Sequence, residues 1–303
     1  PAIDYQTAFA GVPLAIYLVL RMRTHRSPRE ILVALIIAAL GAAIPLALLL
    51  VYHRACFGSP FATGYNYAVT YGADHVHGLL GMTYPKWDAI VGSTIAPSNG
   101  FIALAPWWLL AIAGGRMMWK TREHALVVTV LAVTAILGYF VTSLTAWHAG
   151  WEVGPRYIVA VQPFLLPLVA YALARWDDNP SMIGVAGGLI LIGVVVYTTS
   201  TATLPTWPDS FHNPLYEVAF RLLLDRAGAG TILGTHSALG IAPVLALVLA
   251  VVCVAIRNAG GGSRGLIIAV AIAVLGIAGY RLAGTSAEAR AAYARTLYPA
   301  VAQ

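Results

Sequence analysis

Long apolar runs alternate with polar segments along most of the chain. A helix that crosses a bilayer needs about 20 mostly apolar residues, and eight runs approach or reach that length. They are Ile3–Leu20, Ile31–Tyr52, Phe101–Gly115, Ala125–Leu144, Ile158–Leu173, Met182–Thr199, Leu239–Ile256 and Leu266–Tyr280. The pattern predicts an all-α, polytopic transmembrane helical bundle of about eight spans, with residues 1–303 forming one membrane module.

Composition supports a membrane protein and argues against a soluble one. Of the 303 residues, 59% are hydrophobic and 10% are charged, whereas soluble domains carry about 25% charged residues. The net charge of +6 does not indicate nucleic acid, because most basic residues fall in short loops between apolar runs. Cys56 and Cys253 are too few for a disulfide framework. The chain starts at Pro1 without a signal peptide, so we expect it to be the C-terminal part of a longer protein.

The distribution of basic residues predicts an orientation. Short cytoplasmic loops of membrane proteins are enriched in Lys and Arg. The loops after the first, third, fifth and seventh runs hold Arg21, Arg23, Arg26, Arg29, Arg116, Lys120, Arg122, Arg175, Arg257 and Arg264. We therefore expect a multi-pass protein of the plasma (inner) membrane. Its short basic loops should lie in the cytoplasm and its long loops on the extracytoplasmic side.

Three outward segments are then the places to look for function. Residues 53–100 are rich in glycine, proline and aromatic residues, which is typical of an interfacial segment. The second segment, residues 145–157, is short and contains polar side chains. Residues 200–238 form a loop in which Asn213 is a candidate N-cap and Pro214 a first helical residue, which predicts a short amphipathic helix. Its apolar stripe is Leu215, Val218, Ala219, Leu222 and Leu223.

The stretch Trp147–Phe164 combines acidic, basic and aromatic side chains at the start of an apolar run. Gly154-Pro155 suits the start of a helix, so Arg156 and Tyr157 should stand at the N-terminus of the span from Ile158. A helix N-terminus favours anions, and a guanidinium matches phosphate oxygens. Arg156 is therefore a candidate phosphate or pyrophosphate ligand. The alternative is a local ion pair between Arg156 and Glu152.

Other polar groups on the outward segments have two interpretations each. Glu152 could position an acceptor or act as an acid or base, or simply neutralise Arg156. Trp151 and Tyr157 could stack on a sugar, or belong to the aromatic belt of a membrane interface. Further candidates that could face the same cavity are His148, Tyr65, Asn66, Lys86 and Ser98. The run Asp74-His75-Val76-His77 invites a metal site, but histidines at i and i+2 share a face only on a strand, and a solvated loop is favoured.

Several motifs, in order, resemble a known family. They are FGSPF-TGY, GLLGMTYP, a PS-G turn that opens a span, W--GW--GPRY-----PFL, NPL and LG-----G, between Ala2 and Val248. This series resembles the C-terminal half of bacterial GT-C membrane glycosyltransferases, which are similar to dolichyl-phosphate-mannose–protein mannosyltransferases. The resemblance implies a lipid-linked sugar donor, namely a polyprenyl-phosphate sugar, and a glycan, lipid or protein acceptor on the outer face.

The sequence also departs from that family. Its catalytic aspartate lies in an N-terminal outward loop, which this chain does not contain, so no catalytic residue is assigned. The turn before the third span commonly carries an arginine where this sequence has Asn99. The resemblance implies no cofactor or metal, and a divalent ion is unsupported by the sequence.

Two other classes of protein remain open. A transporter or flippase for a lipid-linked sugar would need a polar path, but the second to eighth spans hold no Asp, Glu, Lys or Arg in their interiors. A non-catalytic membrane scaffold is the third interpretation.

Overall fold

The computed structural model describes residues 5–62, 64–67, 81–148, 153–154, 156–203, 207, 211–224, 238–286 and 291. Throughout these ranges the regular structure is helical, and no strand is present. The chain divides into two compact units: Pro1–Lys86 with Glu123–Trp147, and Trp87–Arg122 with His148–Gln303. We call them the N-terminal unit and the C-terminal unit. The predicted all-α class is confirmed.

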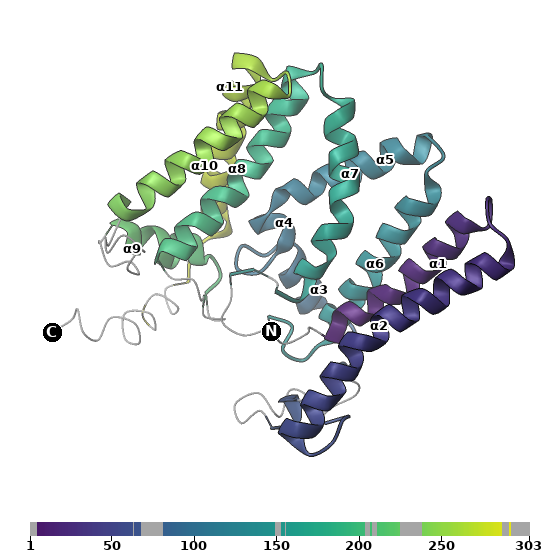
Figure 1. The fold of residues 1–303 in the computed structure, drawn as a ribbon. Coiled ribbons are helices and arrows are strands. Elements are labelled where there is room, and N and C mark those ends of the chain that lie inside the picture. Colours follow the sequence, from purple (N-terminus) through teal and green to yellow (C-terminus); the bar gives the residue numbers. More distant parts are fainter. Residues whose placement is uncertain are drawn as a thin grey trace. The chain divides into compact units, whose positions relative to one another are not determined.

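The N-terminal unit is built on three long helices. Its elements are η1 (Tyr5–Ala10), α1 (Gly11–Met22), α2 (Pro28–Phe57), η2 (Gly64–Tyr67) and α6 (His124–Ser143). The segment formed by η1 and α1 packs along α6 (Figure 1). The rings of Phe9 and Phe140 lie 5.7 Å apart at the contact. At the far end of α1, Arg21 Nη1 lies 3.4 Å from Glu123 Oε2.

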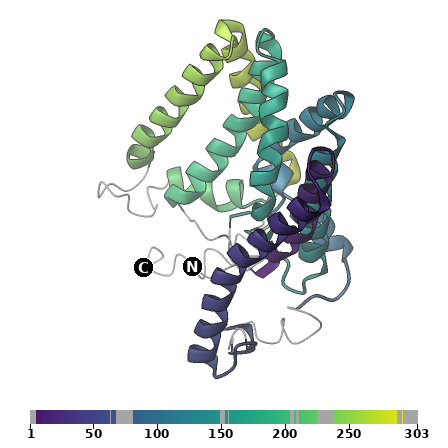
Figure 2. The ribbon, with the colours of Figure 1, turned by 45° about the vertical axis from the view of Figure 1, so that its right-hand side comes forward.

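Helix α2 begins and ends with strong local signals. The Ser27 hydroxyl accepts a hydrogen bond from the Glu30 N–H, and the Glu30 carboxylate accepts one from the Ser27 N–H, which is a capping box. The helix ends at Gly58, whose φ of 75° is in the left-handed region that glycine tolerates. Figure 2 shows the helix bending along its length, and we attribute the bend to Pro45, which lacks a backbone N–H. None of the residues in its most apolar stretch is buried, so this surface suits contact with lipid.

The C-terminal unit contains the remaining described helices. They are α3 (Trp87–Thr94), α4 (Phe101–Leu104), η4 (Pro106–Trp108), α5 (Leu109–Lys120), η5 (Arg156–Val161), α7 (Gln162–Arg175), α8 (Pro180–Thr203), η6 (Leu215–Ala219), α9 (Phe220–Leu224), α10 (Ala238–Asn258), α11 (Gly262–Gly279) and η7 (Tyr280–Ala283). Helix α5 packs against α7, and α8 packs against α10 and α11 (Figures 1 and 2).

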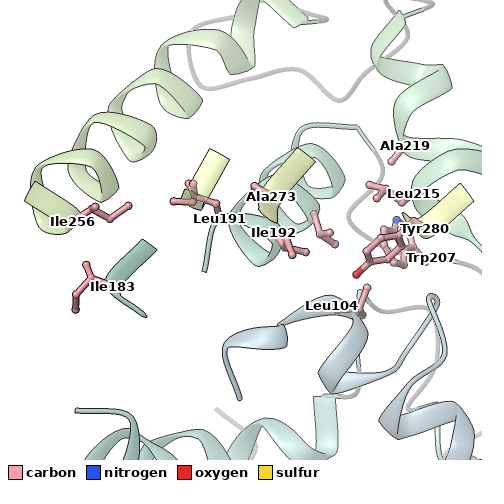
Figure 3. Packing of buried hydrophobic residues seen from close by; sticks show 12 residues of the cluster. Leu104, Ile183, Leu191, Ile192, Trp207, Leu215, Ala219, Ile256, Ala273 and Tyr280 are labelled. Carbon is pink, nitrogen blue, oxygen red and sulfur yellow. The ribbon is translucent and has the colours of Figure 1, made fainter. Parts of the chain in front are cut away.

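Glycines bring α8 and α11 close together. Gly184 and Gly188 on α8 face Gly265 and Ala269 on α11, and a Cβ atom at Gly184 would lie 2.6 Å from the Gly265 carbonyl oxygen. Small residues four apart allow helix backbones to approach closely in membranes, where packing rather than water exclusion holds helices together. Beyond this contact the core continues to Leu104, Trp207, Leu215 and Tyr280, which gather around the end of α11 (Figure 3).

Among the described residues, five helical segments are long and apolar enough to cross a membrane. They are Pro28–Phe57, His124–Ser143, Arg156–Arg175, Pro180–Thr203 and Gly262–Ala283. Two shorter apolar helices, Thr7–Met22 and Ala242–Asn258, coincide with the first and seventh predicted runs. The number of eight spans and the sidedness of the loops stay predictions.

The third predicted run does not form one continuous helix. Helix α4 ends at Leu104 and α5 begins at Leu109, with the short η4 between them. Pro106 disfavours the α conformation at the residue before it, and Ala105 accordingly has φ −140° and ψ 66°. The predicted run Phe101–Gly115 is therefore helical but interrupted at Pro106, and its place as a membrane span stays a prediction.

Candidate functional site

Arg156 is the first residue of a 20-residue apolar helical segment, Arg156–Arg175. The predicted place of this arginine at a helix start is confirmed, although the first turn is the 3-10 helix η5 rather than α-helix. The Arg156 side chain is exposed, and its Cζ lies 5.4 Å from the ring centroid of Tyr157. The Tyr157 side chain is buried. The arginine thus stands at the surface above an aromatic ring that is fixed in the protein.

The turn before Arg156 depends on Gly154. This glycine has a φ of 90°, and its carbonyl accepts a 3.0 Å hydrogen bond from the Arg156 N–H. A Cβ atom there would lie 2.9 Å from the Tyr197 hydroxyl on α8 and 3.3 Å from Leu104 Cδ1 on α4. The turn is therefore held against two other helices, and it sets the position of Arg156.

We expect Gly154→Ala to disturb this turn and to move Arg156. The left-handed conformation costs a non-glycine residue about 1–2 kcal/mol, and the Cβ would also press on Tyr197. Thermal unfolding in micelles should show a lower midpoint than for Gly279→Ala, a control with a helical φ and no atom within 4 Å of its added Cβ. Equal midpoints for the two variants would contradict the assigned role of Gly154.

The other predicted site residues fall into three groups. His148 and Ser98 are half-buried, and Asn99 is buried with an Oδ1 that accepts no hydrogen bond from the described residues. These three belong to the C-terminal unit with Arg156 and Tyr157, whereas Lys86 belongs to the N-terminal unit. Trp151, Glu152 and the run from Asp74 to His77, as well as the side chains of Tyr65 and Asn66, lie outside what the structure describes. Their predicted roles stay predictions.

A buried polar cluster was missed by the sequence reasoning. Glu217 and Asn213 are both fully buried. One carboxylate oxygen of Glu217 accepts a 3.0 Å hydrogen bond from the Asn213 N–H, and the other accepts one from the Ser286 N–H. Asn213 Nδ2 donates to the carbonyl oxygens of Tyr280, at 2.6 Å, and Gly284, at 3.3 Å. An acid inside an otherwise apolar stripe was the signal in the sequence.

This cluster corrects the prediction of the amphipathic helix. A helical segment does follow Pro214, and four residues of the predicted stripe (Leu215, Val218, Ala219 and Leu222) are buried. However, its first part is the π-helix η6, and the Asn213 side chain does not cap it. The Asn213 amide instead holds η7 and the residues after it, because buried polar groups need partners and the nearby carbonyls supply them.

The fold defines the class of protein: an all-helical membrane protein. We find no family model, no curated protein and no solved structure that matches this chain. The resemblance to GT-C glycosyltransferases therefore rests on its sequence motifs.

Proposed function

We propose that this chain is the membrane module of a glycosyltransferase that takes a sugar from a polyprenyl-phosphate donor and transfers it to an acceptor on the extracytoplasmic face. One observation carries the proposal: the exposed guanidinium of Arg156 stands at the first residue of a long apolar helical segment. In the proposed complex, the lipid phosphate lies beside Arg156 and its chain extends along the apolar helices.

The other end of the same helix gives a comparison. Arg175 is the last residue of α7, and its Nη2 donates a 2.8 Å hydrogen bond to the hydroxyl of Tyr171, one turn earlier. A cation at a helix C-terminus is stabilised by the helix dipole, whereas a cation at the N-terminus is opposed by it. Arg156 adds positive charge to an end of the helix that is already positive, and a bound anion would be favoured there.

The proposed reaction places negative charge where Arg156 stands. An acceptor hydroxyl or amine attacks the anomeric carbon of the donor, the bond from that carbon to the phosphate oxygen breaks, and the lipid phosphate leaves. Arg156, together with the positive end of the helix, stabilises the charge that grows on the departing phosphate. By resemblance, an aspartate outside this chain takes the proton of the acceptor.

The test is the substitution Arg156→Ala in the full-length protein. A charge-assisted hydrogen bond contributes about 1.5–3 kcal/mol, so we expect transfer from a polyprenyl-phosphate sugar in membrane vesicles to fall by about ten- to a hundredfold. Arg175→Ala is the matched control, because it removes an arginine that also lies over a tyrosine on the same helix. It should keep transfer within about twofold, as expected for an exposed contact.

Two results would remove the proposed role of Arg156. One is transfer and donor binding at the wild-type level in Arg156→Ala. The other is an equal loss in Arg175→Ala, which would indicate a general effect on helix α7.

A further inference from the structure

A hollow of about 580 Å³ lies beside the end of α11. The residues that line it are distant in sequence from the turn at Gly154 and belong to other elements. Its volume falls in the range of small-ligand sites, about 300–1,000 Å³. The wall combines two basic, two aromatic and further small or apolar residues: Tyr216, Phe220, Arg221, Leu223, Arg281 and Thr285. It therefore offers positive charge and apolar surface together.

The two halves of this hollow are fixed to each other by the buried polar cluster. Arg221 follows η6 on α9, and Arg281 lies on η7. Glu217 accepts a hydrogen bond from the Ser286 N–H, and Asn213 donates to the carbonyls of Tyr280 and Gly284. These bonds hold the chain on both sides of Arg281 and the helical turn that precedes Arg221. The backbone that carries the two guanidinium groups is therefore held in place before any ligand arrives.

Aromatic contacts orient one of the two arginines. Arg281 Cζ lies 5.4 Å from the ring centroid of Tyr216. The Tyr216 hydroxyl donates a 2.8 Å hydrogen bond to the Ile277 carbonyl on α11, and its ring packs edge-on against Phe220 with centroids 5.1 Å apart. A guanidinium stacked on an anchored ring keeps its N–H groups free at the edges, where they can bind a planar or tetrahedral anion.

The charge balance of the described residues favours an anion. No described carboxylate forms a salt bridge with Arg221 or Arg281. The nearby acid that the structure describes is Glu217, and both of its oxygens accept backbone hydrogen bonds inside the protein. Both arginine side chains are exposed. Among the described residues, two guanidinium groups against one buried carboxylate leave a net positive charge at the hollow.

The position of the hollow relative to the membrane limits the class of ligand that it is expected to bind. Arg281 lies near the end of Gly262–Ala283, a segment long and apolar enough to cross a bilayer. The end of a helix that crosses a bilayer lies at the level of the lipid headgroups, where aromatic side chains such as those of Tyr216 and Phe220 are common. We propose that this hollow binds a phosphate ester through Arg221 and Arg281. The proposal does not rest on the proposed glycosyltransferase function, which concerns Arg156.

A phosphate ester at this place has two sources, a lipid headgroup or a soluble phosphate. The test uses the full-length protein purified in zwitterionic, phosphate-free detergent. Thermal unfolding and tryptophan fluorescence are followed while inorganic phosphate, short-chain phosphatidylglycerol or an uncharged short-chain diacylglycerol is added. We expect a raised unfolding midpoint and saturable binding with phosphatidylglycerol but not with diacylglycerol. A response to inorganic phosphate as well would indicate a soluble source.

Variants decide whether the two arginines are responsible. Arg221→Gln with Arg281→Gln should weaken the binding at least tenfold while keeping the unliganded unfolding midpoint and gel-filtration profile. Arg257→Gln, an exposed arginine at the end of α10, is the matched control and should bind as the wild type does.

Three outcomes overturn the proposal. The first is no response of the wild-type protein to either phosphate ligand. The second is equal binding by the double variant and the wild type. The third is a loss in Arg257→Gln as large as the loss in the double variant.

Discussion

The substitution Gly114→Ala is expected to lower the free energy of unfolding by about 3 kcal/mol, at the upper end of what overpacking typically costs. Gly114 lies on α5 where this helix packs against α7. A Cβ atom at Gly114 would lie 1.8 Å from the carbonyl oxygen of Leu168 and 2.6 Å from its carbonyl carbon. Both atoms belong to the backbone, so no side-chain rotation can relieve the overlap. The two helices must separate.

Gly138→Ala is the matched control for this prediction. Gly138 also lies within an apolar helix, α6, but no atom lies within 4 Å of its added Cβ. Because alanine favours helix over glycine by about 1 kcal/mol, this control should be neutral or stabilising. Unfolding is measured by circular dichroism in mixed micelles. If Gly114→Ala proves as stable as Gly138→Ala, the close approach of α5 and α7 is wrong.

Much of the helical architecture could be predicted from the sequence, because the signals are local. An apolar run, the capping residues Ser27 and Glu30, and the glycine that ends α2 each act within a few residues. The break at Pro106 is local too, because a proline disfavours the α conformation at the residue before it. The number of spans depends on the membrane as well as the chain, so it cannot be read from apolar runs alone.

The candidate site was predictable only in part, because sequence signals are local and the contacts of the site are not. Arg156 follows Gly154-Pro155, so its place at a helix start is a local property. The hydrogen bond from Asn213 to the Tyr280 carbonyl joins residues 67 positions apart, and that from Ser286 to Glu217 spans 69. Such pairs depend on how α8, η6 and α11 pack. Sequence patterns therefore identified Arg156 but gave no reason to pair Arg221 with Arg281.

The contact made by the glycines of α8 was predictable in part. Gly184 and Gly188 form a small-xxx-small pattern that a sequence reading can detect. The partner surface, Gly265, Ala269 and Ile272 on α11, is identified only by the structure. This contact matters beyond stability, because α8 carries Tyr197, which supports the Gly154 turn, and α11 leads into Tyr280 and Arg281. One helix pair thus positions both candidate anion sites.

The double substitution Gly184→Ala with Gly188→Ala should have the second large effect. Added Cβ atoms would lie 2.6 Å from the Gly265 carbonyl oxygen and 2.6 Å from Ile272 Cβ, respectively. Overpacking of this kind costs about 1–3 kcal/mol at each position, and the two sites lie on one contact, so their effects need not add. We expect a lower unfolding midpoint and, in the folded fraction, weaker phosphate binding at the hollow beside Arg281.

Gly193→Ala is the control on the same helix. The nearest atom to its added Cβ is the Leu104 carbonyl oxygen at 3.4 Å, which is an ordinary contact. This variant should match or exceed wild-type stability, because alanine is the better helix former. A double variant that unfolds at the same midpoint as Gly193→Ala would show that α8 and α11 do not meet at these glycines. The contact between α8 and α11 could then no longer explain how one helix pair positions both the Gly154 turn before Arg156 and the residue Arg281.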